Sequence, residues 1–203
     1  MKVYLASYAM VTMEKIIKNE GVNFAKKRAI FIPTAGDPYE NQDFVEADKL
    51  ALQRYGIEII DLDLKNKSEC EVRQLIMGAD IVLVAGGDTF YLMEKLIESG
   101  ADKVIKDFIN NGGVYIGSSA GSIVCCPTIE GAEEFDNPGL APSLKNFNGM
   151  NVFNEVIIPH THKEKYFERV RRASDKLKSQ GYKVNKLTDD DVLFYNGDRS
   201  LLL

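Results

Sequence analysis

A chain of 203 residues with 45% hydrophobic and 27% charged residues suits one α/β domain with a substantial core. Its net charge of −5 gives no electrostatic reason to expect nucleic acid or an anionic membrane as a partner. No apolar run reaches the roughly 18 residues of a membrane span, and no secretory signal pattern precedes the first strand. The three cysteines (Cys70, Cys125 and Cys126) match neither a metal site nor a disulfide framework, so we expect a cytoplasmic protein.

Short apolar runs alternate with amphipathic segments from the start of the chain. The apolar runs predict strands at residues 3–6, 29–33, 57–64, 79–85 and 114–116. Apolar stripes at helical spacing predict helices at residues 10–19, 43–55, 68–78, 89–99 and 102–111. This rhythm predicts an α/β fold in one domain over residues 1–203, with a mostly parallel sheet and helices on both faces.

The second part of the chain has a different composition. Prolines and glycines punctuate residues 127–150, which we interpret as a long loop of the kind that forms a lid or stays disordered. The remaining predicted elements are a strand at 152–159, a charged helix at 164–180, and strands at 182–187 and 192–195. Asn196-Gly197 then predicts a C-terminal hairpin with residues 200–203.

Two glycine-rich turns follow neighbouring predicted strands. They are Gly86-Gly87-Asp88-Thr89 and Gly117-Ser118-Ser119-Ala120-Gly121. Ligands of parallel sheets bind beyond the carboxyl ends of the strands, so we expect both turns to line one cleft.

Ser119 is the central residue of a G-x-S-x-G pattern between a strand and a helix-compatible segment. A serine on such a sharp turn can be reached by a base, while a backbone N–H receives the oxyanion. The same pentapeptide also suits a turn that only connects two elements or holds a phosphate, and by itself it does not separate the two.

His160 and His162 are the only histidines, and a serine nucleophile needs a base that titrates near neutral pH. We expect the two rings to point to opposite faces of the extended segment, so that at most one of them faces Ser119. We favour His160 because it directly follows the predicted strand. A zinc pair is the alternative, but no convincing third ligand accompanies the two histidines.

The turn at Gly86–Thr89 can hold a phosphate or donate N–H groups to an acyl oxyanion. It lacks the P-loop and dinucleotide-binding signatures, so we favour the oxyanion role. Asp88 and Thr89 can instead simply cap the following helix.

Several acidic residues can orient the histidine as the third member of a triad. One set is the run Asp189 to Asp191, and the other comprises Glu133, Glu134 and Asp136 in the long loop. Cys125 and Cys126 are also candidate nucleophiles, but their position inside the segment after the turn favours buried core residues.

The ordered motifs resemble the aspartyl dipeptidase (dipeptidase E)-like serine peptidases, to which cyanophycinase is related. The matching stretches are IVLVAGGDTF (81–90), YIGSSAG (115–121), PTI (127–129) and IPH (158–160), and AIFIP (29–33) and Asn196-Gly197 also fit. The resemblance covers nearly the whole chain. It implies a fold like that of class I glutamine amidotransferases and metal-free hydrolysis of short peptides through an acyl-serine.

Carried over to this chain, the resemblance makes Ser119 the nucleophile and His160 the base, with the N–H groups of Gly87 and Ala120 as oxyanion donors. The family offers two acidic positions for the third member. One matches Asp136 or Glu134, and the other matches Asp189. We favour Asp189, because it immediately precedes the C-terminal hairpin and can pack behind the histidine, and keep Asp136 as the alternative.

One departure bears on specificity. The aspartyl dipeptidase branch carries a longer insertion after its histidine, ending in a Gly-Glu-Thr-Arg segment, and Tyr166 aligns with that arginine here. Without a guanidinium the site lacks a bidentate partner for an aspartate side chain. The sequence therefore predicts a serine peptidase acting on dipeptides or short peptides, without strict aspartyl specificity and without a cofactor.

Two rival functions and the assembly state remain open at this level. A non-catalytic, amidotransferase-like protein that binds a small ligand is the main alternative, and a thiol enzyme using Cys125 or Cys126 is the other. The expected partner is a short peptide substrate, with neither nucleic acid nor membrane, and both a monomer and a homodimer fit the sequence.

Overall fold

A computed structural model describes residues 1–203, and its centre is a seven-stranded sheet in the order β3-β2-β4-β5-β1-β8-β9. The strands are β1 (Lys2–Ala6), β2 (Arg28–Ile32), β3 (Glu58–Asp61), β4 (Ile81–Val84), β5 (Val114–Ser118), β8 (Val192–Tyr195) and β9 (Ser200–Leu202). The first five run parallel, whereas β8 is antiparallel to β1 and β9 is antiparallel to β8. The predicted fold class and the C-terminal hairpin are confirmed.

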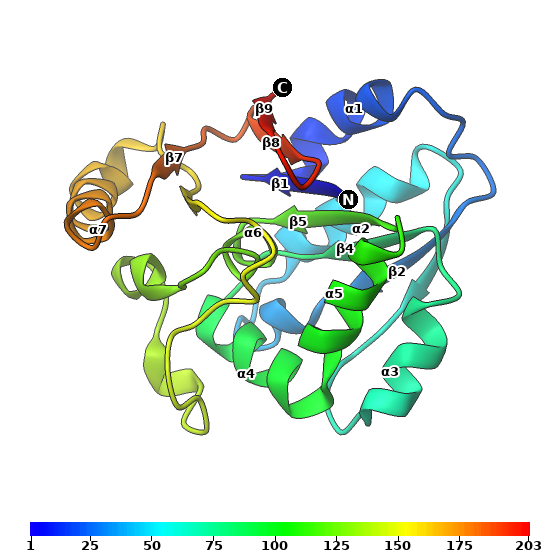
Figure 1. The fold of residues 1–203 in the computed structure, drawn as a ribbon, viewed down its shortest axis with the longest axis horizontal. Helices are drawn as coiled ribbons and strands as arrows, with labels where there is room; N and C mark the ends of the chain where they lie inside the picture. The colour runs from blue at the N-terminus through cyan, green and yellow to red at the C-terminus, as the bar shows by residue number, and fades with distance from the viewer.

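Helices cover both faces of this sheet (Figure 1). One face carries α1 (Ala9–Glu20) and α2 (Asp43–Gln53), and the other carries α3 (Glu69–Ile76), α4 (Thr89–Ser99) and α5 (Ala101–Asn110). Alternate strand residues supply the two cores: Tyr4 and Ala6 pack toward α1 and α2, while Val3 and Leu5 pack toward the opposite helices. Both sets are buried because a parallel sheet between two helix layers excludes water from each face. None of the helices combines the length and apolar character needed to cross a membrane.

A smaller unit of structure lies beyond the carboxyl ends of the parallel strands, to the left in Figure 1. It consists of the two-stranded parallel sheet β6 (Val156–Ile158) and β7 (Val184–Lys186) with the helix α7 (Phe167–Ser179). The helix packs its buried residues Val170, Ala173 and Leu177 into the larger of the two cores. This unit delivers chain segments to the edge of the main sheet where a ligand is expected.

The long predicted strand at 152–159 is wrong in extent, because only Val156–Ile158 is a strand and it pairs outside the main sheet. The amides of Val152 and Phe153 instead donate to the carbonyl of Cys125, at 2.9 and 3.0 Å. This segment therefore satisfies its backbone against the turn that follows the short helix α6 (Ala120–Ile123) and leaves no ladder for a neighbouring strand.

The segment 127–150 is ordered and contains two short 3₁₀ helices, η2 (Glu130–Glu134) and η3 (Pro138–Leu140). The predicted helix at 164–180 begins with a third 3₁₀ turn, η4 (Glu164–Tyr166), before α7. Ion pairs from Arg172 to Glu134 and from Lys176 to Glu133, at 2.7 and 2.5 Å, join η2 to α7. The long loop thus packs as a wall of the fold.

Candidate active site

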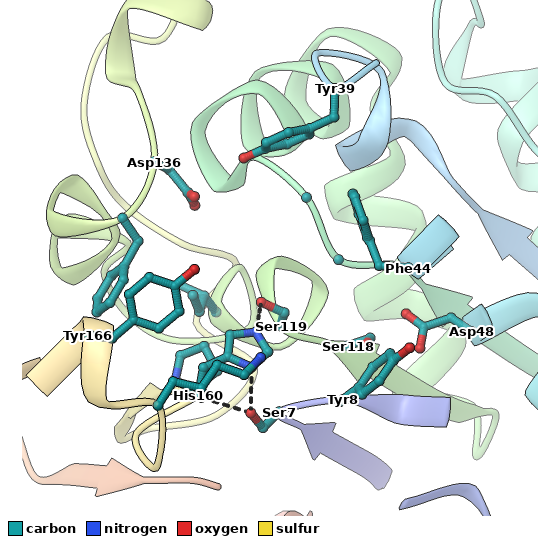
Figure 2. A pocket seen from close by; sticks show the side chains of 16 residues that line it. Ser7, Tyr8, Tyr39, Phe44, Asp48, Ser118, Ser119, Asp136, His160 and Tyr166 are labelled. Atoms are coloured by element: carbon teal, nitrogen blue, oxygen red, sulfur yellow. Dashed lines mark hydrogen bonds between the residues drawn. The ribbon is translucent and has the colours of Figure 1, made fainter. Parts of the chain in front are cut away.

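Ser119 lies on a strained turn between β5 and α6. Its backbone angles are φ 49° and ψ −108°, a conformation that few non-glycine residues adopt. The flanking glycines permit the close crossing of strand and helix. A Cβ on Gly117 would lie 2.5 Å from the carbonyl oxygen of Gly121, and one on Gly121 would lie 2.2 Å from that of Val84. The sequence pattern therefore folds as the expected sharp strand-to-helix turn, with the hydroxyl in the cleft of Figure 2.

His160 faces this serine from the segment after β6. Its Nε2 lies 3.1 Å from Ser119 Oγ, within hydrogen-bond distance (Figure 2). The residue has a left-handed backbone, with φ 58°, and its N–H donates to Ser7 Oγ at 2.9 Å. Because the chain turns here, the ring leaves the strand direction and reaches across to the elbow.

Asp189 lies behind the histidine ring, in the loop between β7 and β8. Its Oδ1 bonds to His160 Nδ1 and accepts from Ser7 Oγ at 3.0 Å, and Lys163 Nζ lies 2.9 Å from its Oδ2. Burial alone would raise the pKa of Asp189, but the bonds from His160, Lys163 and Ser7 lower it well below its ordinary value. The carboxylate is therefore ionised at neutral pH and holds the ring nitrogen that faces away from Ser119.

The other acidic candidates occupy different places. Asp191 caps its own turn, where its Oδ2 accepts from the amide and the hydroxyl of Thr188. Glu134 pairs with Arg172 on α7. Asp136 lines the cleft, but its Oδ2 accepts from the amide and the hydroxyl of Thr89, at 3.0 and 2.6 Å. Its loop lies across the start of α4, so Asp136 makes no direct hydrogen bond to the histidine.

His162 lies on the same side as Asp189, with Nε2 3.7 Å from Asp189 Oδ2. The expectation that the two histidines point to opposite faces is wrong, because residues two apart in an extended segment share a face, and both rings lie beside Asp189. No group of three His, Cys, Asp or Glu residues is arranged to hold a metal ion, so the geometry offers the zinc alternative no third ligand.

Two backbone N–H groups are free near Ser119. Those of Gly87 and Ala120 donate to no acceptor within the protein. Gly87 has φ +145°, and a Cβ there would lie 1.9 Å from the carbonyl oxygen of Ala35, so only glycine fits. Asp88 caps α4 by accepting from the amide of Tyr91 at 2.9 Å, as one of the sequence interpretations had it. The free N–H of Gly87 precedes this cap and is available to an oxyanion.

The cleft around these groups is a cavity of about 500 Å³ lined by 16 residues. Aromatic side chains form much of its wall: Tyr8, Tyr39, Phe44, Phe135 and Tyr166. The cysteines contribute nothing to it. Both Cys125 and Cys126 are fully buried, and burial raises the pKa of the Cys126 thiol to about 12, so neither is a thiolate at neutral pH.

The sequence interpretation missed several residues at this site, among them Ser7, Asp48 and Lys163. Ser7 directly follows β1, so the rule that ligands meet the carboxyl ends of parallel strands already pointed to it. Asp48 is 1% exposed. The helical pattern of residues 43–55 did not indicate that this polar residue is buried. Lys163 had no distinguishing signal, because its role depends on the approach of Asp189 from a distant segment.

Comparisons with known proteins identify the family of this chain. The profile of peptidase family S51 matches residues 6–203. The uncharacterized peptidase Lin0382 of Listeria innocua is 36% identical over 138 residues, which cover 68% of this chain and 66% of that protein. Peptidase E of Shigella flexneri is 33% identical over 135 residues, covering 66% of this chain but only 56% of peptidase E. The crystal structure of a putative peptidase E protein from Listeria monocytogenes EGD-e superposes with a TM-score of 0.92, at 28% identity, over 100% of this chain and 97% of that one.

The fold and the cleft thus define a hydrolase whose α/β domain carries a serine at a sharp strand-to-helix turn. The chain belongs to peptidase family S51 and is a serine-type peptidase. The family expected from the sequence motifs is confirmed.

Proposed function

We propose that this peptidase hydrolyses dipeptides and other short peptides through an acyl-enzyme formed on Ser119. His160 Nε2 takes the proton of the Ser119 hydroxyl as its oxygen attacks the peptide carbonyl. The tetrahedral oxyanion accepts hydrogen bonds from the N–H groups of Gly87 and Ala120. Collapse of this intermediate breaks the C–N bond, and His160 gives its proton to the leaving amine. Water, deprotonated by His160, then releases the acyl group.

Asp189 supports these proton transfers without touching the substrate. Its carboxylate accepts the Nδ1 proton of His160, which leaves Nε2 as the acceptor that faces Ser119. The same negative charge stabilises the imidazolium that forms after the first transfer. The observation that carries the proposal is this continuous series of contacts from Asp189 through His160 to Ser119, ending beside two free N–H groups.

The cleft supports neutral short peptides as substrates in preference to peptides with an N-terminal aspartate. Lys163 is the only lysine or arginine among the lining residues, and its ammonium already lies 2.9 Å from Asp189. Tyr166, which aligns with an arginine of the aspartyl dipeptidases, forms part of the aromatic wall and packs edge-on against Phe135. A substrate carboxylate would therefore meet aromatic rings without a free cation to pair with it.

Covalent labelling tests the mechanism. A fluorophosphonate probe is expected to add once to the wild-type protein, at Ser119, as read by intact mass and peptide mapping. The Ser119→Ala variant should remain folded, take no label, and lose at least about 10⁴-fold in hydrolysis of the best substrate from a dipeptide library. Unchanged hydrolysis by Ser119→Ala, or a folded wild-type protein that takes no label, would contradict the proposal and favour a ligand-binding role.

The same dipeptide library tests the specificity. Neutral first residues are expected to give higher kcat/KM than aspartate. Hydrolysis of Asp-Xaa dipeptides together with indifference to neutral ones would overturn this part of the proposal and leave the serine mechanism intact.

A further inference from the structure

Asp136 is the one carboxylate of the cleft that the proposed proton transfers do not use and that still opens toward the substrate. Its Oδ2 is held by the amide and the hydroxyl of Thr89, whereas its Oδ1 has no hydrogen-bond donor within the protein. Figure 2 shows the carboxylate directed into the cleft between Tyr39 and Tyr166. One oxygen is thus fixed by the start of α4, and the other is presented to whatever binds.

The surroundings of Asp136 lack a compensating positive charge. No lysine, arginine or histidine lies within 4.0 Å of it, and the nearby carboxylate is that of Asp88. Burial, reinforced by Asp88, raises the pKa of Asp136 to about 6 in spite of the bonds from Thr89. The same negative charges, after burial itself, raise the pKa of the Tyr39 hydroxyl to about 12. This end of the cleft therefore favours a cation.

The connection between Asp136 and the oxyanion site limits what that cation can be. Thr89, which holds the carboxylate, is two residues after Gly87, and two residues span at most about 7 Å of chain. In a peptide with a free N-terminus cleaved after its first residue, the α-nitrogen is two bonds from the scissile carbonyl carbon. Because Asp136 is held by a residue two positions after Gly87, the α-ammonium is the substrate cation tied most closely to a carbonyl bonded there.

We propose that Asp136 binds the α-ammonium group of the substrate's first residue, with the hydroxyls of Tyr39 and Tyr166 beside it as further acceptors. The inference rests on the proposed function, since it takes the peptide carbonyl to lie between Ser119 and Gly87. It makes the enzyme one that removes a single N-terminal residue and discriminates against peptides whose amino group is blocked.

Asp48 is a less suitable anchor, although it also lines the cleft. Its carboxylate is 1% exposed and accepts from the amide of Met10 at 3.1 Å. Bonds from Ser118 and from the backbone of Gly86 engage it further. With its acceptor sites occupied by these groups, Asp48 has little capacity left for a substrate ammonium.

The test compares the best dipeptide of the library with its N-acetyl derivative on the wild type, Asp136→Asn and Glu134→Gln. Glu134→Gln is the matched control, because it removes an equal charge from the same loop at a residue that pairs with Arg172 outside the cleft. The asparagine keeps an acceptor for Thr89. Fluorophosphonate labelling of Ser119, which needs no ammonium, is measured in parallel.

We expect the wild type to cleave the free dipeptide at least about 10-fold better than the acetylated one. Asp136→Asn should lower kcat/KM for the free dipeptide by about 10- to 100-fold, mainly through KM, and should abolish the discrimination. Its labelling rate, and all properties of Glu134→Gln, should match the wild type. A dipeptide with lysine first and its α-acetyl form distinguish the two ammonium groups: loss of cleavage on acetylation supports the α-ammonium, and retained cleavage overturns it.

Equal cleavage of free and acetylated dipeptides by a wild-type protein that labels at Ser119 would overturn the inference and leave the proposed function standing. A fall in kcat together with slower labelling in Asp136→Asn would also overturn it, because that pattern belongs to a residue that positions the catalytic groups. Absence of both labelling and hydrolysis in the wild type would remove the proposed function, and the inference with it.

Discussion

At the scale of single residues, the proposed chemistry depends on how His160 is held. Three groups from distant parts of the chain fix it: Ser7 bonds to its backbone N–H, Asp189 bonds to its ring, and Ser119 lies at the opposite ring nitrogen. Ser7 joins the first two, because its hydroxyl also donates to Asp189. The imidazole is thereby oriented before substrate arrives.

Replacing Asp189 by asparagine should have a larger effect on kcat than any other acidic substitution in the cleft. An amide presents a donor or a weaker acceptor to Nδ1 and stabilises the wrong tautomer, so we expect kcat to fall by about 10³- to 10⁴-fold. Steady-state kinetics on the best dipeptide, with circular dichroism as a check on folding, measures this. A fall of less than about 10-fold would argue against Asp189 as the third member of the triad.

The Ser7→Ala variant should lower kcat by about 10-fold with little change in KM, since it removes bonds that orient His160 and Asp189 but none that contacts the substrate. Ser122→Ala is the matched control. It removes a buried hydroxyl bonded to the carbonyl of Ala6 at 2.8 Å, close in the fold but without contact to the histidine. Equal losses of kcat in the two variants would mean that Ser7 acts only through stability.

At the scale of elements, the strand-to-helix turns decide where the free N–H groups point. The β4–α4 turn passes so close to the 3₁₀ turn η1 (Thr34–Gly36) that Asp88 N–H bonds to the carbonyl of Ala35 at 2.8 Å. That contact fixes the direction of the neighbouring Gly87 N–H. The turn depends on glycine because the backbone of Ala35 occupies the space of a side chain.

The Gly87→Ala variant should lose both stability and activity. Its Cβ meets backbone atoms at 1.9 and 2.2 Å, which cannot yield without moving η1 or the turn. We expect a loss of about 2–4 kcal/mol in urea unfolding and at least a 100-fold fall in kcat, roughly the effect of removing one oxyanion donor. Gly112→Ala is the control, because Gly112 also has a positive φ, of +90°, but no atom within 4 Å of the added Cβ.

The control should lose only about 1 kcal/mol of stability and retain wild-type kcat. Comparable losses of kcat in both variants would show that backbone strain in general, and not the position of the Gly87 N–H, limits the reaction.

At the scale of the whole molecule, Asp48 connects elements from separate parts of the sheet. From α2 it accepts a bond from Met10 in α1, and it also bonds with Ser118 at the end of β5 and Gly86 after β4. Burial raises its pKa to about 7 in spite of these bonds. A buried carboxyl that resists ionisation makes the stability of the fold depend on pH.

The direction in which stability changes with pH follows from proton binding in the native and unfolded states. The native state holds the Asp48 proton up to about pH 7, whereas the unfolded chain releases it near pH 4, so stability falls as pH rises between these values. Asp189 acts oppositely: its lowered pKa contributes stability above about pH 4 that is lost on acidification, below the window of Asp48. Asp136 adds a smaller loss of stability up to about pH 6.

We therefore predict that the free energy of unfolding of Asp48→Asn declines less from pH 5 to pH 8 than that of the wild type, by about 2–3 kcal/mol. Urea unfolding of both proteins at the two pH values measures the two declines. Their comparison does not depend on how much the substitution itself destabilises the protein. Identical declines in the two proteins would show that Asp48 is ionised throughout this range.

The local patterns of the sequence determined the parallel strands, the tight turns and the family of this protein. Continuous apolar runs predicted the parallel strands, because strands covered on both faces need apolar residues throughout. The glycines around Ser119 and at Gly87 predicted tight turns, because the backbone approaches that they permit are intrinsic to those turns. The motifs in their order indicated the peptidase family, and His160 emerged as the candidate base because the chain has only two histidines.

Only the tertiary structure decided which groups meet. Ser7, Lys163 and Asp189 surround His160 because β1, the segment after β6 and the loop before β8 all end at one edge of the sheet, and no local periodicity encodes such a convergence. The same holds for Asp136, whose place on Thr89 depends on how the Pro- and Gly-rich segment packs across α4. Short-range sterics and burial can be read from neighbouring residues, whereas contacts between segments distant in the sequence depend on the packing of the whole chain.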